Sequence, residues 1–274
     1  MISIITSIRN LFPMNKLYFE SLTKYTHNKF ELIIIDNAST DGSGEYFRNA
    51  GARVISNTGN YSYCYTQNQG LNAASGDILC FFNNDLIVSP DWDEKLIRIM
   101  DKENLGLVSF ASNDRIESIV ATRKIRNRWK AIKYPIMFVF GINRFSLSTM
   151  HKLMYKNWEK YTSKRYNQFG DAIKEGFSGS CIAIKREIIE KLGIWDEYVF
   201  SGDFDYYIRS KIRSLEVGDI KPIHILIGVY FHHYTRLSTK AKVNVPYVNV
   251  PNDVQIEEKW GKERMKQLLK DIEY

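Results

Sequence analysis

The sequence predicts an α/β fold with a mostly parallel central sheet, helices on both faces of that sheet and a basic, helical insertion. Runs of β-branched residues alternate with helical segments through the first hundred residues, and the runs ISIITSI and FELIIID are almost entirely apolar. Strands without polar alternation are typical of parallel sheets that are covered on both faces. The loss of this alternation between residues 115 and 174 predicts the insertion.

The elements follow in chain order. The first half predicts strands at residues 2–8, 30–36, 52–57 and 76–85, separated by helices at residues 16–26, 39–50 and 67–74. Ser89 and Pro90 resemble an N-cap and a first helical residue, so a helix is expected from there to Met100. The second half predicts a glycine-rich strand and a helix at residues 176–193, a strand at 223–231 and an amphipathic helix at 256–272.

The composition is that of a globular chain of 274 residues, 44% hydrophobic and 14% aromatic, enough for one large domain or two small ones. Cys64, Cys80 and Cys181 have no C-x-x-C spacing, so we expect no disulfide, no zinc site and a reducing, cytoplasmic location. The chain opens in an apolar strand without a signal-peptide pattern. The central apolar run at 134–142 is shorter than the ~20 residues that span a bilayer.

Polar side chains follow directly on the strand that ends in FFNND. Asn83, Asn84 and Asp85 are therefore expected at the carboxyl end of a core strand, which is where open α/β sheets bind ligands. A carboxylate beside amide oxygens suits a hard divalent cation, and such a cation suits a diphosphate. The alternative is a polar turn that only ends the strand, because Asn and Asp are common in turns.

Asp36 ends the second strand, in the run IIIDNASTDGS. A carboxylate in that position can accept a hydrogen bond from a nucleobase or a ribose, and the Ser/Thr/Gly run offers backbone N–H groups at a helix start. The alternative is that Asp36 only caps the helix. No G-x-G-x-x-G follows the first strand, which argues against a dinucleotide site.

Two further groups of titratable residues lie in the second half of the chain. In FSGDFDYYIRSKI, Asp203 and Asp205 precede a helix that is expected to begin near Tyr206. One of them could act as a general base in a cleft, or both could only complement the helix dipole. His232 and His233 are expected just after the last strand, where a histidine pair is more often structural than metal-bound.

Taken in order, six segments resemble the family 2 glycosyltransferases, in particular their bacterial rhamnosyltransferase-like branch. They are IIIDNASTDGS, NYSYCYTQNQG, GDILCFFNND, GFSGSCIAIKREIIEKLGIWDE, GDFDYYIR and HHYTRLST, and EKWG at 258–261 is similar to a tail of that branch. The resemblance implies a GT-A fold in four segments. These are a nucleotide-sugar-binding half at 1–114, a basic aromatic insertion at 115–174, an acceptor and catalytic half at 175–240 and a C-terminal tail helix at 241–274.

The resemblance also implies an inverting transfer of a sugar from a UDP-, dTDP- or GDP-linked donor to a hydroxyl of a glycan, lipid-linked or protein acceptor. Asp203 falls on the catalytic base. Asp85 falls on the carboxylate that holds Mn²⁺ or Mg²⁺ on the diphosphate, with His233 or His232 as a further ligand. Asp36 falls on the nucleobase contact and Asn83 on the ribose side. Further substrate contacts are expected from Ser7, Asn60, Asn68, Asn84, Gly179 and Asp205.

Four positions depart from the family pattern: Gly202 stands where glutamate is usual, Arg9 where tyrosine is usual, Asn83 where aspartate is common and Ser62 where glycine is common, although asparagine is frequent at the Asn83 position in this branch. Gly202 leaves the base without its usual acidic neighbour. The first alternative is therefore a catalytically degenerate relative that only binds a nucleotide or a glycan. The second is a sugar nucleotidyltransferase, which should carry glycine and basic residues after its first strand, whereas SIRNLFPMNK has no glycine.

Residues 115–174 contain 14 Lys and Arg and 3 Asp and Glu, a net charge of +11 in a chain whose total is +7. Aromatic residues are interleaved with these charges: Trp129, Tyr134, Phe138, Phe140, Phe145, Trp158 and Tyr161. The segment could form a peripheral contact with an anionic membrane, an ordinary helical insertion with solvated charges, or a surface for an anionic glycan or protein acceptor. No nucleic-acid-binding fold accompanies it, so no nucleic-acid partner is expected.

Overall fold

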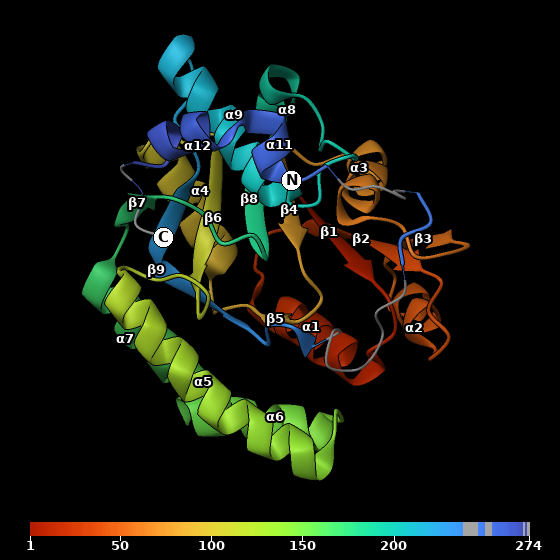
Figure 1. The fold of residues 1–274 in the computed structure, drawn as a ribbon. Helices are drawn as coiled ribbons and strands as arrows, with labels where there is room; N and C mark the ends of the chain where they lie inside the picture. Colours follow the sequence, from red (N-terminus) through yellow and green to blue (C-terminus); the bar gives the residue numbers. More distant parts are fainter. Residues whose placement is uncertain (238–245, 250–253, 271, 273–274) are drawn as a thin grey trace.

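The computed structural model describes residues 1–237, 246–249, 254–270 and 272, and within them a nine-stranded sheet forms the centre of the molecule (Figure 1). Its first four strands in the sequence form a parallel block in the order β3-β2-β1-β4. They are β1 (Ile2–Ile8), β2 (Phe30–Asn37), β3 (Arg53–Asn57) and β4 (Ile78–Phe82). The apolar runs of β1 and β2 suit this position, because both faces of these strands are covered.

The second part of the sheet is mixed. β8 (Cys181–Lys185) pairs antiparallel with β4 on one side and with β6 (Leu107–Ser112) on the other. β9 (His224–His233) is parallel to β6, and the short strands β5 (Leu86–Ile87) and β7 (Ile173–Glu175) pair antiparallel with β9. The predicted mostly parallel α/β sheet is confirmed, and β8 joins its two parts into one continuous sheet.

Helices cover both faces of the sheet, and each face has its own apolar core (Figure 1). The first core packs against α1 (Phe12–Tyr25), α2 (Ser43–Asn49), α4 (Trp92–Lys102), α5 (Ile119–Phe140), α6 (Arg144–Tyr155) and α7 (Trp158–Phe169). The second core packs against α3 (Tyr63–Ala73), α8 (Arg186–Leu192), α9 (Gly202–Glu216), α11 (Ile256–Trp260) and α12 (Lys262–Leu268).

Two helix boundaries differ from the sequence prediction, and the backbone explains both. α4 begins at Trp92 rather than directly after Ser89, because Asp91 has a φ of 57° and this left-handed conformation cannot continue a helix. The expected C-terminal helix is divided into α11 and α12. Gly261 lies between them with a φ of 74°, which favours glycine and ends a helix.

The basic segment is helical through α5, α6 and α7. Trp129 and Trp158 are buried in the first core. This burial is expected for an ordinary helical insertion whose aromatic residues pack in the core. Phe138, Phe140 and Phe145 instead remain exposed where α5 meets α6, and Phe138 is 92% exposed. In the part of the chain that the structure describes, no helix combines the length and the apolar sequence needed to cross a membrane.

Candidate active site

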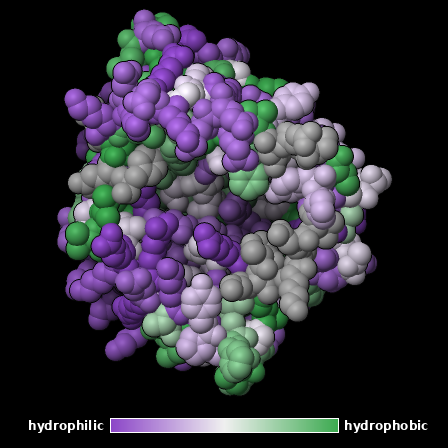
Figure 2. All heavy atoms as spheres, viewed as in Figure 1, coloured by the Kyte–Doolittle hydropathy of each residue, from purple (hydrophilic) through white to green (hydrophobic). Residues whose placement is uncertain are grey.

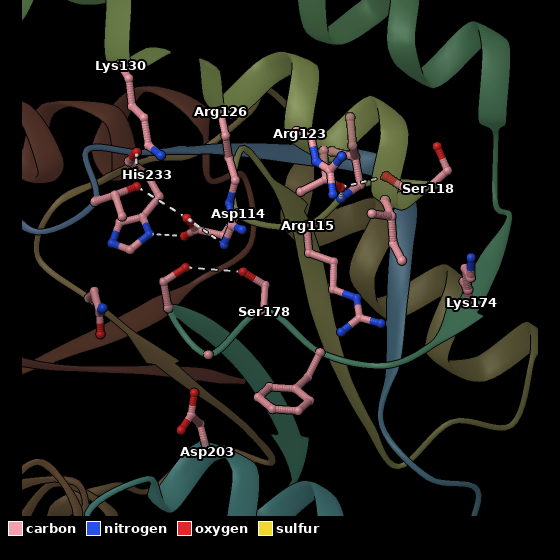
Figure 3. Close-up of a pocket in the computed structure, with 18 of the residues that line it drawn as sticks. Asp114, Arg115, Ser118, Arg123, Arg126, Lys130, Lys174, Ser178, Asp203 and His233 are labelled. Atoms are coloured by element: carbon pink, nitrogen blue, oxygen red, sulfur yellow. Dashed lines mark hydrogen bonds and ion pairs between the residues drawn. The ribbon is translucent and has the colours of Figure 1, made fainter. Parts of the chain in front are cut away.

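A cleft of about 740 Å³ opens at the sheet edge where β4 and β6 end. Asn83 follows β4, Asp114 follows β6, and residues 178–180 precede β8, whose antiparallel direction brings its start to the same edge. Asp203 and His233 also line the cleft, and α5 forms its opposite wall (Figure 3). Figure 2 shows that this face is hollowed at its centre, with hydrophilic residues gathered on the α5 side.

Asp203 lines this cleft from the first turn of α9, which begins at Gly202 and not near Tyr206 as predicted. Its Oδ1 accepts a hydrogen bond of 2.9 Å from the N–H of Phe204. Its carboxylate lies against Gly179, where a Cβ atom would collide with it. Burial raises the pKa of Asp203, and the backbone hydrogen bonds offset this only in part. A carboxylate with a raised pKa in a cleft can take a proton from a hydroxyl.

Asp85 and His233 lie side by side because β5 pairs with β9, with Leu86 opposite His233. The two histidines are thus the last residues of β9 rather than residues after it. Nε2 of His233 is 3.0 Å from Oδ1 of Asp85, and Nδ1 of His233 contacts Asp114. The side chain of Asn113 bonds both the N–H and the C=O of His233, at 2.7 and 2.8 Å, and so fixes the strand end.

The carboxylates of Asp85 and Asp114 raise the pKa of the His233 ring. Burial opposes its protonation, but Asp85 and Asp114 outweigh this effect and raise the pKa of His233 well above its ordinary value. Burial would raise the pKa of Asp114, but the His233 ring outweighs burial and lowers that pKa. The position of the His233 ring between two carboxylates therefore favours positive charge.

Asp85 and His233 also fit a divalent cation. Two neighbouring ligands of an octahedral cation, with bonds of about 2.1 Å, lie about 3 Å apart. This matches the 3.0 Å between Oδ1 of Asp85 and Nε2 of His233. Asp114 contacts the other ring nitrogen, as carboxylates beside metal-bound histidines do. Among the described residues, no three His, Cys, Asp or Glu side chains enclose a metal, so phosphate and water oxygens would complete the shell.

His232 is directed away from Asp85, because successive residues of a strand point to opposite faces. Its Nδ1 is 2.8 Å from the hydroxyl of Tyr155, and its ring packs edge-on against Trp129 with the centroids 4.4 Å apart. Burial lowers the pKa of His232 well below its ordinary value. Of the two histidines that the sequence left open, the structure brings only His233 to the cleft.

Asp114 is a residue of this cluster that sequence reasoning missed. A usable signal was present, because Asp114 follows an apolar strand in the run VSFASND, just as Asp85 follows FFNN. The rule that places ligands at the carboxyl ends of parallel strands applies equally to both. The positions of the individual cations on the wall formed by α5 were not predicted either.

Three predicted donor contacts lie on the neighbouring edge of the parallel block, outside the residues that line the cleft. Asp36, at the end of β2, accepts a hydrogen bond of 2.9 Å from the N–H of Ser39 in the turn before α2; the N-cap of that helix is Gly42, so Asp36 does not cap it. Ser7, near the end of β1, donates to Oγ1 of Thr66 at 2.6 Å. Asn60 lies between β3 and α3. The structure therefore brings these three to one edge, with Asp36 and Ser7 already bonded within the protein.

Asn68 and Asn84, which were also expected to contact substrate, are bonded into the scaffold. Asn68 is buried, and its side chain bonds both the N–H and the C=O of Trp195, at 3.0 and 2.9 Å. Asn84 donates to Oδ1 of Asn15 at 2.6 Å and so ties the end of β4 to α1. The structure thus gives both side chains a positioning role.

Asp205 is fully buried and lies two residues after Asp203, so its side chain leaves α9 on the side opposite the cleft. Its carboxylate forms ion pairs with Arg209 at 2.8 Å and Lys259 at 2.6 Å, and accepts a hydrogen bond of 2.8 Å from the indole of Trp260. These contacts join α9 to α11. Asp205 is absent from the residues that line the cleft, so the structure does not bring it to the expected substrate site.

The sequence model described as glycosyl transferase family 2 matches residues 3–193, more than half of the chain. The chain belongs to glycosyl transferase family 2. This confirms the predicted family and the prediction of a glycosyltransferase. Among characterised sequences, it is 24% identical over 236 residues to the O-antigen biosynthesis protein RfbC of Myxococcus xanthus. The match covers 79% of this chain but only 16% of that much longer relative.

Solved structures of similar fold confirm the GT-A architecture of this family 2 glycosyltransferase. The mannosyltransferase PcManGT of Pyrobaculum calidifontis, solved with GDP-Man and Mn²⁺, matches with a TM-score of 0.54 and 15% identity. The match covers 90% of this chain and 65% of that one. S. aureus TarS 1-349 in complex with UDP matches with a TM-score of 0.55 and 15% identity, over 98% and 70% of the two chains.

The structure explains two departures of this chain from the family 2 pattern. A Cβ atom at Gly202 would collide with the sulfur of Cys64, so the usual glutamate does not fit in this packing. Arg9, in place of a tyrosine, donates from Nη1 to the carbonyl of Asn37 at 2.7 Å. The guanidinium of Arg9 is thereby held at the end of β2.

Proposed function

We propose that this family 2 glycosyltransferase transfers a sugar, with inversion, from a nucleoside-diphosphate donor to an acceptor hydroxyl. The observation that carries the proposal is the position of Asp203, whose carboxylate has a raised pKa and lies over Gly179 in the cleft. The second support is that His233, the partner of Asp85, lines the same cleft. The proposed base, Asp203, and the proposed diphosphate site at His233 thus line the same cleft.

In the proposed reaction, Asp203 takes the proton of the acceptor hydroxyl, and the acceptor oxygen forms a bond to the anomeric carbon. The bond from that carbon to the diphosphate oxygen breaks, and its electron pair leaves with the nucleoside diphosphate. The configuration inverts because this is a single in-line displacement. Because Gly179 has no side chain, it leaves the carboxylate of Asp203 uncovered, whereas a larger residue would collide with that carboxylate.

For the cofactor, we propose that Asp85 and His233 hold Mn²⁺ or Mg²⁺, and that Asp114 orients the ring of His233. When bound, the cation would stabilise the negative charge of the departing diphosphate. Asn83, which lines the cleft after β4, is proposed to face the ribose side of the donor. His232 is left out of this proposal because its ring is bonded within the core.

For the donor, we propose that the nucleobase and ribose bind along the edge that carries Asp36, Ser7 and Asn60. PcManGT was solved with GDP-Man and TarS with UDP, which supports a nucleoside diphosphate. UDP-, dTDP- and GDP-sugars are the candidates. Because Asp36 and Ser7 already have partners within the protein, their donor contacts would use remaining oxygen lone pairs or exchange existing hydrogen bonds.

For location and acceptor, we propose a cytoplasmic enzyme that acts on a glycan, lipid-linked or protein acceptor. The three cysteines are buried and free, which supports a reducing compartment. Peripheral contact with an anionic membrane is supported by the exposed Phe138, Phe140 and Phe145. Trp129 and Trp158 pack in the core and do not contribute to this contact, whereas Tyr134 is also exposed.

A catalytically degenerate relative is the second candidate, and one observation favours it. Gly202 is packed against Cys64, so the acidic neighbour that usually accompanies the base has no room here. Such a relative would bind the nucleotide without turning it over. Family 2 membership offers no support for the other alternative, a sugar nucleotidyltransferase.

The test uses thermal unfolding of the whole protein with UDP, dTDP, GDP and CMP, each with and without Mn²⁺. We expect one nucleoside diphosphate to raise Tm in the presence of Mn²⁺, and CMP to have little effect. The sugar donor of that nucleotide is then assayed for hydrolysis and transfer. A Tm shift without any product would favour the degenerate relative, and no shift with any of the four would contradict the proposed donor.

A further inference from the structure

We infer that the wall of the cleft formed by α5 is an acceptor subsite for an acidic glycan, one that carries phosphate or carboxylate groups near the accepting hydroxyl. This inference rests on the proposed function, since it assigns the acceptor side of the same cleft. The positive charge that faces Asp203 comes from a row of cationic side chains, which consists of Arg123, Arg126 and Lys130 of α5 together with Arg115 and Lys174.

Helical spacing places three members of this row on the same face of α5. Arg123, Arg126 and Lys130 are three and four residues apart, so they share one face of α5. All three line the cleft, together with Arg115 before the helix and Lys174 in β7. Figure 3 shows Lys130, Arg126 and Arg123 extending from α5 on one side of the pocket, and Asp203 on the other.

The charges of the cleft are unbalanced. Its lining contains five cationic side chains, Arg115, Arg123, Arg126, Lys130 and Lys174, and two carboxylates, Asp114 and Asp203. Asp114 already contacts the ring of His233, and its other oxygen is 4.0 Å from Arg126. A ligand that carries negative charge would restore the balance.

Two cations of the row lack the partners that basic residues have elsewhere on the insertion. Arg144 forms a two-pronged ion pair with Glu20, at 2.7 Å for each bond. Within the described part of the chain, neither Arg123 nor Lys130 has a carboxylate at ion-pair distance, and both are exposed to the cleft. The positive charges of Arg123 and Lys130 are therefore not neutralised by any carboxylate of the described residues at ion-pair distance.

The donor diphosphate does not account for the whole row. Its proposed place is beside Asp85 and His233, and Figure 3 shows Lys130 on the same side of the pocket as His233. The positive charge continues from there through Arg126 and Arg123 to Lys174, on the side of the cleft away from His233. A second anionic group, on the acceptor, fits that part of the wall.

The side chains also indicate the kind of anion. Guanidinium groups bind phosphate and carboxylate through two parallel hydrogen bonds, and Arg123 and Arg126 offer two such groups on successive turns. Ile116, Ile119 and Phe177 line the same cleft and give apolar surface for the faces of sugar rings. This combination suits an acidic oligosaccharide rather than a neutral one.

The test measures binding of short glycans to the whole protein by titration calorimetry, with Mn²⁺ and the stabilising nucleoside diphosphate present. The probes are trigalacturonic acid, neutral galactotriose, and maltotriose with and without a terminal phosphate, so that carboxylate and phosphate are tested separately. We expect at least one acidic probe to bind about tenfold more tightly than its neutral counterpart, and the difference to shrink as salt is added.

Two adjacent residues of α5 provide a matched pair of variants. Arg123 lines the cleft, whereas Lys124 is exposed and does not, so Arg123→Glu and Lys124→Glu change the net charge equally at neighbouring positions. We expect Arg123→Glu to lower the affinity for the acidic probe about tenfold or more, since a charge-assisted bond is lost. Lys124→Glu should stay within about twofold of the wild type, and Arg123→Lys should retain part of the affinity.

Equal binding of acidic and neutral probes, no binding of any acidic probe, or equal losses in the two charge-reversal variants would overturn the inference. So would loss of binding to anionic phospholipid vesicles in Arg123→Glu with unchanged glycan binding, which would assign the wall to a membrane. Nucleotide binding in the same titrations separates the two proposals: if the wild type binds no nucleoside diphosphate with Mn²⁺, the proposed function itself fails.

Discussion

The backbone of Gly179 lies against the carboxylate of Asp203, and no space remains between them for a Cβ atom. The glycine belongs to the segment before β8 and the aspartate to the first turn of α9, so two distant parts of the chain meet at this contact. Burial at this place raises the pKa of Asp203. The position of the proposed base is thus tied to the absence of a side chain at residue 179.

Gly179→Ala should lower kcat by about 10²-fold, because a displacement of a reacting group by about 1 Å costs that much. The added methyl group has to push the Asp203 carboxylate aside. Affinity for the nucleoside diphosphate with Mn²⁺ should change little. The measurements are transfer kinetics and nucleotide titration, with Tm to verify folding; wild-type kcat in a folded variant would contradict this account.

Asp203→Asn should reduce transfer by ~10²–10⁴-fold, the usual contribution of a positioned base. The amide keeps the size of the side chain and its place over Gly179 but cannot take a proton. Nucleotide affinity should stay near that of the wild type. More than a tenth of the wild-type rate in this variant would show that another group is the base.

The raised pKa of Asp203 predicts a shifted pH profile. A carboxylate whose pKa is raised becomes protonated at a higher pH than an ordinary aspartate, whose pKa is about 3.9. Since the base must be ionised, kcat/KM should fall as the pH decreases through this raised pKa, and the acid limb should lie above 3.9. The profile is measured under conditions where Tm is constant, and an acid limb at or below the ordinary value would contradict the prediction.

Asp85→Ala should raise the Kd of the nucleoside diphosphate about 10- to 100-fold in Mn²⁺ and change it little in EDTA, because one proposed metal ligand is lost. Asp114→Asn removes a carboxylate that contacts the other nitrogen of His233, and should weaken Mn²⁺ affinity by at least about tenfold. Both effects are measured by calorimetry. Full activity of the wild type after exhaustive chelation would remove the metal from the mechanism.

Asp205→Ala should destabilise the protein by about 3–5 kcal/mol, because breaking a buried ion pair leaves charge without compensation. Its partners Arg209 and Lys259 would lose their common carboxylate. Asp219→Ala is the matched control, since it breaks an ion pair with Arg213 at the surface and should shift Tm only slightly. A normal Tm together with lost nucleotide binding in Asp205→Ala would restore the substrate-binding role expected from the sequence.

The fold and part of the site could be predicted because both follow from local patterns. Apolar runs between helices identify parallel strands, and the rule that ligands bind at their carboxyl ends places Asn83 and Asp85 at one edge. Alternation along a strand distinguishes His232 from His233 once the strand is known to extend that far. The sequence prediction ended the strand at residue 231, and so left both histidines open.

Other parts of the site depend on contacts between distant segments, which a pattern within one segment does not contain. Asn68 and Asp205 are conspicuous polar residues in the sequence, but their partners lie at Trp195 and Lys259. The packing of Gly202 against Cys64 is equally non-local. The antiparallel direction of β8 could not be predicted from its own residues either, because an apolar run fits both directions.

The position of β8 limits how the chain can be divided into fragments that fold. β8 is hydrogen bonded along both edges, to β4 and to β6. A fragment that ends at residue 114 would contain both neighbours and lack the strand between them, which would leave apolar edges open to other chains. Open edges of this kind promote aggregation. The segment 1–114 is thus unsuited to production as an autonomous fragment, because its part of the sheet is completed only by a strand that comes later in the chain.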